Sequence, residues 1–113
     1  MRTYDQKMAE KAFQRVSSSE NDEKYRSFAL AFPALIHTCG LAQAVSFAEA
    51  KDRSDYLGDL NDILKVLVEG AAVNLSRESR EAGVVDYMRL TRRAVDATSW
   101  IKRYVQAFAK EGD

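Results

Sequence analysis

The spacing of apolar residues along the chain predicts helices throughout. Apolar side chains recur every three or four positions over residues 8–16, 25–39 and 41–48, which is the period of an amphipathic helix. The clearest pattern lies near the C-terminus, where steps of 3 and 4 alternate through Tyr87, Leu90, Ala94, Ala97, Ile101, Tyr104 and Phe108. This run predicts one long helix of about six turns.

Polar and helix-breaking residues predict where the first two helices begin and end. Thr3 or Asp5 is a suitable cap for the first helix, and the polar run 17–21 separates it from the second. Pro33 lies inside the second apolar pattern and is expected to bend or divide that helix, because proline lacks a backbone donor. Gly40 is the expected stop.

Three further elements follow in the middle of the chain. Residues 41–50 form a short third helix, closed by the charged turn 51–53. Ser54 is the expected cap of a fourth helix, whose leucine stripe continues to Ala71, with Gly70 near its end. Residues 72–83 are less periodic and predict a linker with a turn or two of helix. The expected fold is therefore all-α, a compact bundle of about five to six helices with a long C-terminal helix, in a single domain over residues 1–113.

Composition agrees with this prediction and narrows the class of protein. The 113 residues include sixteen alanines but only five glycines and one proline, and 46% are hydrophobic and 30% charged. Such a chain can bury one core and has few helix breakers. Cys39 is the only cysteine, which excludes an internal disulfide. The start of the chain resembles no signal peptide and no eighteen apolar residues run together, so the sequence predicts a cytoplasmic protein with no membrane partner.

The charges cancel overall but are separated along the chain. Seventeen basic and seventeen acidic residues give a net charge of zero. By segment, the net charge is +2 over residues 1–16, −4 over 17–72, +4 over 73–110 and −2 over 111–113. A neutral protein with this distribution can present one basic and one acidic surface, suited to gripping a polyanion or to stacking copies of itself.

The long C-terminal helix carries a basic stripe opposite its apolar side. At 100° per residue, an arc of about 100° contains Arg89, Arg92, Arg93, Asp96, Trp100, Arg103 and Lys110. One interpretation is a phosphate-binding face with an indole that stacks on a base or anchors a protein. The other is a solvated face with a half-buried tryptophan at its edge. The first helix has a smaller basic stripe of Lys7, Lys11 and Arg15.

The candidate chemistry outside the basic stripes is sparse. Asp55, Asp59 and Asp62 share one face of the fourth helix, where they predict a solvated or partner-facing surface, with a divalent-cation site as the alternative. His37 is the only histidine and points about 200° away from Cys39, so the two form no thiol–base pair within one turn. We therefore predict no catalytic centre, no metal and no cofactor.

Three stretches together resemble a known family. The segment from Phe32 to Phe47 contains Pro33, Leu35-Ile36 and Gly40-Leu41 followed by Gln43-Ala44. It resembles the signature of the small subunit of type III-B CRISPR effector complexes, the Cmr small-subunit family. Residues 2–9 resemble that family's N-terminal helix, and residues 87–91 and 100–104 resemble its C-terminal helix. His37 stands where arginine is frequent in the family.

This resemblance implies a non-catalytic helical subunit that is stacked in a few copies within a crRNA-guided ribonucleoprotein. Its partners would be the other Cmr subunits, the crRNA and the target RNA, while neighbouring subunits cut the nucleic acid. The residues expected to contact the RNA backbone are Lys7, Lys11, Arg15, Arg26, His37, Arg89, Arg92, Arg93 and Arg103. Those expected to contact protein partners are Trp100, Asp55, Asp59 and Asp62. The alternative function is a helical adaptor whose basic stripe binds an acidic protein without any nucleic acid.

Overall fold

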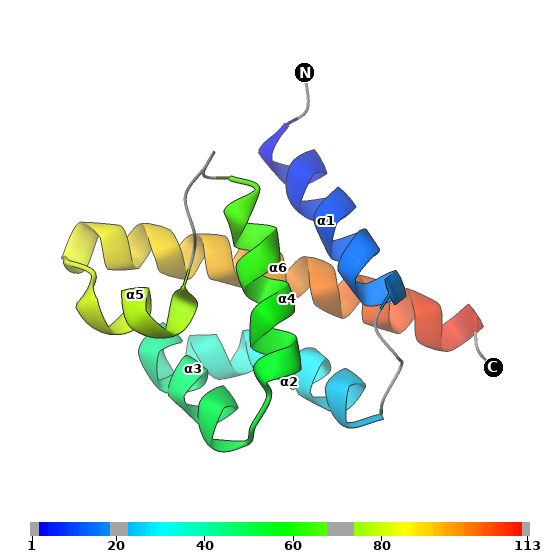
Figure 1. Cartoon of the computed structure of the whole chain (residues 1–113), viewed down its shortest axis with the longest axis horizontal. Helices are drawn as coiled ribbons and strands as arrows, with labels where there is room; N and C mark the ends of the chain where they lie inside the picture. The colour runs from blue at the N-terminus through cyan, green and yellow to red at the C-terminus, as the bar shows by residue number, and fades with distance from the viewer. Residues whose placement is uncertain (1–2, 19–22, 68–73, 112–113) are drawn as a thin grey trace.

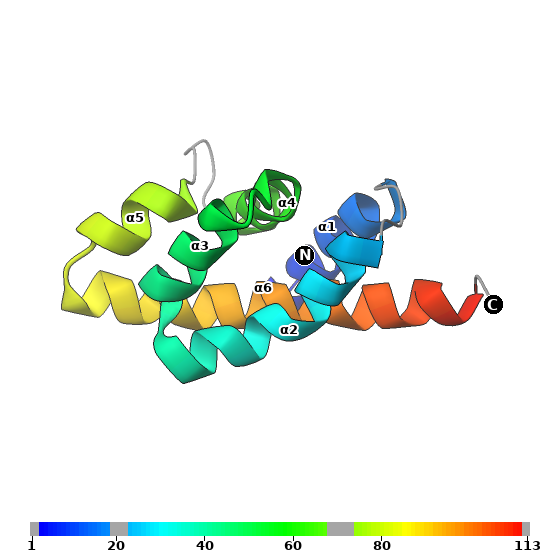
Figure 2. The same cartoon turned by 90° about the horizontal axis from the view of Figure 1, so that it is seen from below.

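The computed structural model describes residues 3–18, 23–67 and 74–111, and over these residues the fold is all-α, as the sequence predicts. The chain forms six helices in this part: α1 (Tyr4–Ser18), α2 (Glu23–Cys39), α3 (Leu41–Ala50), α4 (Ser54–Lys65), α5 (Leu75–Glu81) and α6 (Val84–Glu111). The 28-residue α6 follows the longest axis of a molecule that measures 44 × 38 × 21 Å, and α1 and α4 lie across it (Figures 1 and 2). It is longer than predicted because it begins before Tyr87.

The core lies where the other helices pack against one side of α6. That side is fully buried at Ala94, Ala97 and Ile101. These residues belong to the apolar seam read from the sequence, so the inward face of α6 was predicted correctly. The remaining helices contribute Met8, Ala12, Val16, Ala29, Phe32, Ile36, Leu41, Ala44, Val45, Ala48, Leu60, Ile63 and Leu75 to the same core.

An aromatic cluster joins α4 to α2. The Tyr56 ring is fully buried, and its centroid lies 5.1 Å from Phe32, 5.3 Å from Phe28 and 5.7 Å from Tyr25. All three pairs meet edge to face, the geometry that aligns a ring edge with a neighbouring π-face. This cluster fixes the position of α4 and therefore of the polar residues on its next turn.

Two helix ends have the predicted chemistry, the Thr3 cap and the Gly40 stop, and a third has a cap that was not predicted. The Thr3 hydroxyl accepts a hydrogen bond from the Gln6 backbone at 3.1 Å, and the Gln6 side chain accepts one from the Thr3 backbone at 2.9 Å, so Thr3 caps α1. Gly40 separates α2 from α3 with a φ of 88°, a conformation that favours glycine. The Asn74 side chain accepts a hydrogen bond from the Arg77 backbone at 3.1 Å and caps α5, the short helix of the predicted linker.

Other boundaries differ from the sequence predictions. Of the two outcomes expected at Pro33, a bend or a division, the division does not occur: Pro33 lies inside the single helix α2, between the buried residues Phe32 and Ile36. The predicted Ser54 cap is wrong: Ser54 is the first residue of α4, and Arg53 before it makes no side-chain cap. Within the first turn, Asp55 Oδ1 accepts a hydrogen bond from the Tyr56 backbone at 2.8 Å. Helix α4 ends at Lys65, and residues 68–73, which include Gly70 and Ala71, lie outside the described residues. Ser17 and Ser18 belong to α1, whereas residues 19–21 of the predicted polar turn are likewise outside.

Candidate nucleic-acid interface

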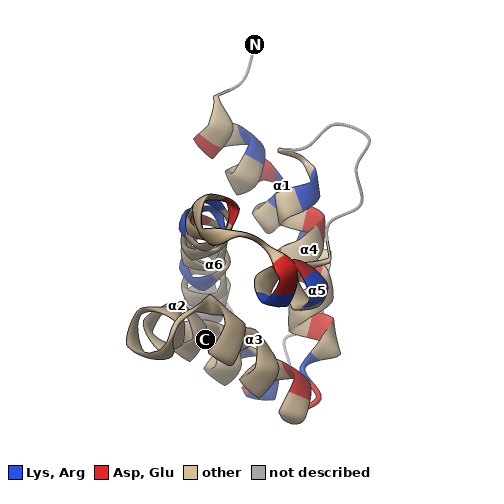
Figure 3. Ribbon diagram, turned by 90° about the vertical axis from the view of Figure 1, so that its left-hand side faces the viewer, with Lys and Arg blue, Asp and Glu red and all other residues tan. Residues whose placement is uncertain are grey.

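The basic stripe of α6 faces outward. Arg89, Arg92 and Arg103 are exposed and Arg93 is half-buried, on the side of the helix opposite the buried residues. Within the described part of the chain, no carboxylate forms an ion pair with any of these four guanidinium groups. Figure 3 shows how basic segments mark the flank of α6. The arrangement leaves four cationic donors available to an anionic ligand.

The α5–α6 corner adds an arginine that the sequence analysis missed. Arg77 on α5 lines a hollow together with Arg89 and Arg93 of α6. The same hollow is lined by Glu78, Glu81 and Asp86, and Glu81 lies 3.7 Å from the Arg77 guanidinium. No sequence pattern placed Arg77 there, because its position depends on how α5 folds back along α6.

A second hollow brings the end of α2 to the same helix. His37, exposed in the last turn of α2, lines it together with Arg92 of α6. The other lining residues are mostly apolar, among them Ile36, Met88 and Val95. A shared hollow thus joins His37, one of the predicted RNA contacts outside α6, to an arginine of α6.

Aromatic side chains border the basic flank. Trp100 is half-buried, its ring stacks on Tyr104 at 6.0 Å, and the Arg103 guanidinium carbon lies 5.3 Å from the ring centroid. The Phe13 ring of α1 and the Tyr104 ring form a T-shaped pair with centroids 5.6 Å apart. The cation–π contact holds Arg103 close to the helix surface while its N–H groups can still donate.

The basic residues of α1 lie on a different surface. Lys7 and Lys11 line a hollow with Val66, just beyond α4, and Arg15 points at the acidic residues of α4. Arg26 is half-buried near the start of α2, about 16 Å along that helix from His37. No described contact therefore joins Lys7, Lys11 or Arg26 to the basic flank of α6.

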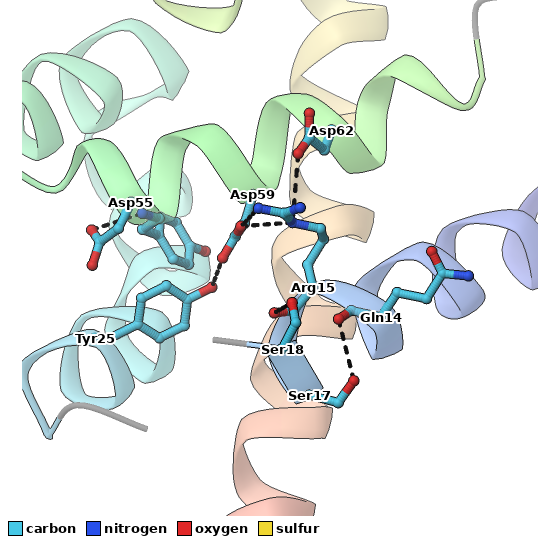
Figure 4. A network of polar contacts seen from close by, with 9 residues as sticks. Gln14, Arg15, Ser17, Ser18, Tyr25, Asp55, Asp59 and Asp62 are labelled. Carbon is cyan, nitrogen blue, oxygen red and sulfur yellow. Dashed lines mark hydrogen bonds and ion pairs between the residues drawn. The ribbon is translucent and has the colours of Figure 1, made fainter. Parts of the chain in front are cut away.

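Arg15 is held by a polar network between α1, α2 and α4 (Figure 4). Its Nε donates to Asp59 Oδ1 at 2.9 Å, its Nη2 lies 2.9 Å from the same oxygen, and its Nε lies 3.5 Å from Asp62 Oδ2. The Tyr25 hydroxyl donates to Asp59 Oδ2 at 2.6 Å. The hydrogen bond to Asp59 raises the pKa of Arg15. The network gives Arg15 a structural role that the sequence analysis did not foresee.

Asp59 corrects the expectation of an exposed acidic face. Its side chain is only 7% exposed, whereas that of Asp62 is 43% exposed and Asp55 is also exposed. Asp59 is buried because it follows Tyr56 by three residues and so lies beside the apolar stripe of α4. Its carboxylate serves Arg15 and Tyr25, which leaves Asp55 and Asp62 as the candidates for partner contacts.

The network is buried enough to perturb its tyrosines. Burial raises the pKa of Tyr25, and its hydrogen bond to Asp59 raises that pKa further. Burial also raises the pKa of Tyr56, whose hydroxyl is buried without a hydrogen-bond partner among the described residues. In the same part of the chain, no three metal-ligating side chains converge and no helix is long and apolar enough to cross a bilayer.

Comparison with known proteins gives one consistent family. The family model described as CRISPR-associated protein (Cas_Cmr5) matches residues 4–108. The CRISPR system Cmr subunit Cmr5 of Thermus thermophilus is 35% identical over 114 aligned residues, which cover 98% of this chain and 100% of that protein. The X-ray structure of a CRISPR-associated Cmr5 family protein from the same organism matches with a TM-score of 0.80 at 33% identity, over 95% of this chain and 97% of that one.

Proposed function

The chain belongs to the Cas_Cmr5 family of CRISPR-associated proteins, and we propose from this premise that it is a structural subunit of a Cmr effector complex. In this role the protein is not an enzyme. Several copies stack beside one another in the cytoplasm, contact the other Cmr subunits, and hold the target RNA and crRNA while neighbouring subunits perform the cutting.

The observation that carries the RNA-binding part of the proposal is the outward flank of α6. Arg89, Arg92, Arg93 and Arg103 are at least partly exposed and make no ion pair within the described residues. Guanidinium groups bind phosphate through two parallel hydrogen bonds and need no base-specific contact. Because pairing with the guide already reads the sequence, a backbone-binding surface is sufficient for this subunit.

We propose that only some of the predicted RNA contacts take part, and that Arg77 joins them. Arg77 and His37 join the α6 arginines through the two hollows described above. Arg15 is engaged with Asp59 and is therefore removed from the proposed RNA contacts. No described contact joins Lys7, Lys11 or Arg26 to the basic flank of α6, so RNA would reach them only along a second path over the protein surface.

The experiment is a salt titration of target-RNA binding by the complex reconstituted with guide RNA and partner subunits. The double variant Arg89→Ala/Arg93→Ala should weaken binding about tenfold or more at low salt and reduce the slope of log K against log salt by about 1–2. The matched control is Lys65→Ala/Arg80→Ala, which removes two cations from α4 and α5 outside the α6 flank and should leave both quantities unchanged.

Equal binding by the double variant and the parent at every salt concentration would overturn the assignment.

Purification separates the proposal from the adaptor alternative, in which the same flank binds an acidic protein. Co-purifying RNA supports the proposal, whereas an acidic protein that is released by Arg89→Ala/Arg93→Ala, with no RNA present, supports the adaptor.

A further inference from the structure

The hollow that His37 and Arg92 share has a lining that phosphate binding alone does not require. It lies between the end of α2 and the first half of α6, which run side by side (Figure 2), and its volume is about 520 Å³. Its walls are mostly apolar: Ile36 is buried, Val95 is half-buried, and Met88 lies at the mouth with 66% of its surface exposed. We call it the α2/α6 hollow.

Five polar side chains complete the lining, and two of them already have partners. The Thr91 hydroxyl donates to the Tyr87 carbonyl at 2.8 Å, and the Tyr87 hydroxyl accepts a hydrogen bond from the backbone of α3 at 3.1 Å. The other three are an imidazole, a guanidinium and a carboxylate, on His37, Arg92 and Asp96. The hollow therefore combines apolar walls with a mixed set of hydrogen-bond donors and acceptors.

This combination suits a nucleobase better than a phosphate. A base has two faces of low polarity and an edge of hydrogen-bond donors and acceptors. The apolar walls can cover a face, the Met88 thioether is suited to contact an aromatic ring, and His37 and Asp96 can meet the edge. A phosphate inside the hollow would be repelled by the Asp96 carboxylate, so it is favoured only at the mouth, where Arg92 is exposed.

The α2/α6 hollow also adjoins the proposed RNA-binding surface. Arg92 belongs both to the hollow and to the basic flank of α6, and Arg89 precedes it by about 4.5 Å along the helix axis. A strand whose phosphates contact these two guanidinium groups therefore passes the mouth of the hollow. An aliphatic side chain of a protein would fill the same walls but would leave His37 and Asp96 without a matching polar group.

We infer that the α2/α6 hollow binds the base of an unpaired RNA nucleotide whose phosphate contacts Arg92. A base inside a duplex cannot enter, because its edge is paired and its faces are stacked. The inference rests on the proposed function, and it adds a contact to a base to the backbone contacts of the α6 arginines.

The test compares two single-stranded RNA probes that differ only in their bases. One is a fluorescein-labelled oligouridylate about twelve nucleotides long, and the other is the same ribose–phosphate chain without bases. Fluorescence anisotropy at low salt measures the Kd of each probe for the full chain, at protein concentrations up to about 1 mM. The probe without bases should bind about fivefold more weakly or worse, because it keeps the phosphates but cannot fill the hollow.

The variant Met88→Gln/Val95→Thr locates this difference in the hollow. It makes two walls polar without changing the charge, so the two probes should then bind within about twofold of each other. Val84→Thr/Val85→Gln is the matched control, because both valines are exposed on the same helix outside the hollow, and it should keep the fivefold difference. Arg92→Gln should weaken both probes by the same factor, since both carry phosphates. Far-UV circular dichroism confirms that each variant is folded.

Equal binding of the two probes by the parent, or binding of neither, overturns the inference. So does a difference that survives in Met88→Gln/Val95→Thr, because the bases are then held elsewhere, for example at Trp100. A variant that binds both probes as the parent does but is lost from the reconstituted complex overturns it too, because the hollow then takes a protein side chain. The salt titration of the complex tests the RNA-binding proposal separately: a loss in Arg89→Ala/Arg93→Ala, together with equal binding of the probes, leaves that proposal intact without the base contact.

Discussion

Replacing Asp59 by alanine should destabilise the fold, because its carboxylate joins three helices. The Tyr25 hydroxyl donates to it at 2.6 Å in a buried position, and Arg15 donates to it at 2.9 Å. A hydrogen bond to a charged group contributes about 1.5–3 kcal/mol, and a buried donor left unsatisfied costs about as much again in desolvation. The Arg15 side chain is 40% exposed, so water and Asp62 can replace much of what it loses. We therefore expect Asp59→Ala to lower the free energy of unfolding by about 3 kcal/mol.

Urea unfolding followed by circular dichroism measures this loss, which corresponds to a decrease in Tm of about 12–20 °C for a domain of this size. Asp62→Ala is the matched control: the same helix loses a carboxylate that is 43% exposed and 3.5 Å from Arg15, and the expected change is below about 0.5 kcal/mol. If Asp59→Ala is no more destabilising than Asp62→Ala, the network does not hold α1, α2 and α4 together. Asp59 would then return to the set of candidate partner contacts.

Two further predictions concern single groups in the fold. Because burial raises the pKa of Tyr56, the unfolded chain loses the phenolic proton at a lower pH than the folded chain does, so the free energy of unfolding should fall above about pH 10. The variant Tyr56→Phe should reduce this fall. It also removes a buried hydroxyl that has no partner among the described residues, so the free energy of unfolding at pH 7 should stay equal or rise by up to about 1 kcal/mol. Thermal unfolding at pH 7 and pH 11 tests this, and a large loss at pH 7 would contradict it. Gly40→Ala should lower the free energy of unfolding by about 1–2 kcal/mol, because φ at Gly40 is 88°; a loss no larger than that of Ala42→Gly would refute the strain at this position.

The helices were predictable because their signals are local. The steps of three and four in the long C-terminal helix, the Thr3 cap and the Gly40 stop each depend on residues within one or two turns. The Ser54 cap was wrong because α4 begins at Ser54 itself. Of the two outcomes expected at Pro33, a bend or a division, the division does not occur. At Pro33 the burial of the neighbouring side chains outweighs the missing backbone donor.

The residues of the candidate nucleic-acid interface were predictable only where a single helix carries them. The α6 arginines share a face by helical geometry alone, whereas Arg77 reaches them through the folding of α5 against α6. The burial of Asp59 had a sequence signal, since it lies three residues after Tyr56 and four before Ile63 on the apolar stripe. Its donors, Arg15 and Tyr25, are 44 and 34 residues away, and no local pattern reports contacts at that separation.

Photo-cross-linking of a 4-thiouridine-labelled target RNA within the reconstituted complex tests most directly whether α6 contacts the RNA. Mass spectrometry of the digested complex would identify the linked peptides. We expect cross-links in the peptides of α6 between Arg89 and Tyr104, with Trp100 as an efficient acceptor beside Arg103. Cross-links confined to the Lys7 and Lys11 surface, or none to this chain in a complex that retains its target, would contradict RNA binding by α6.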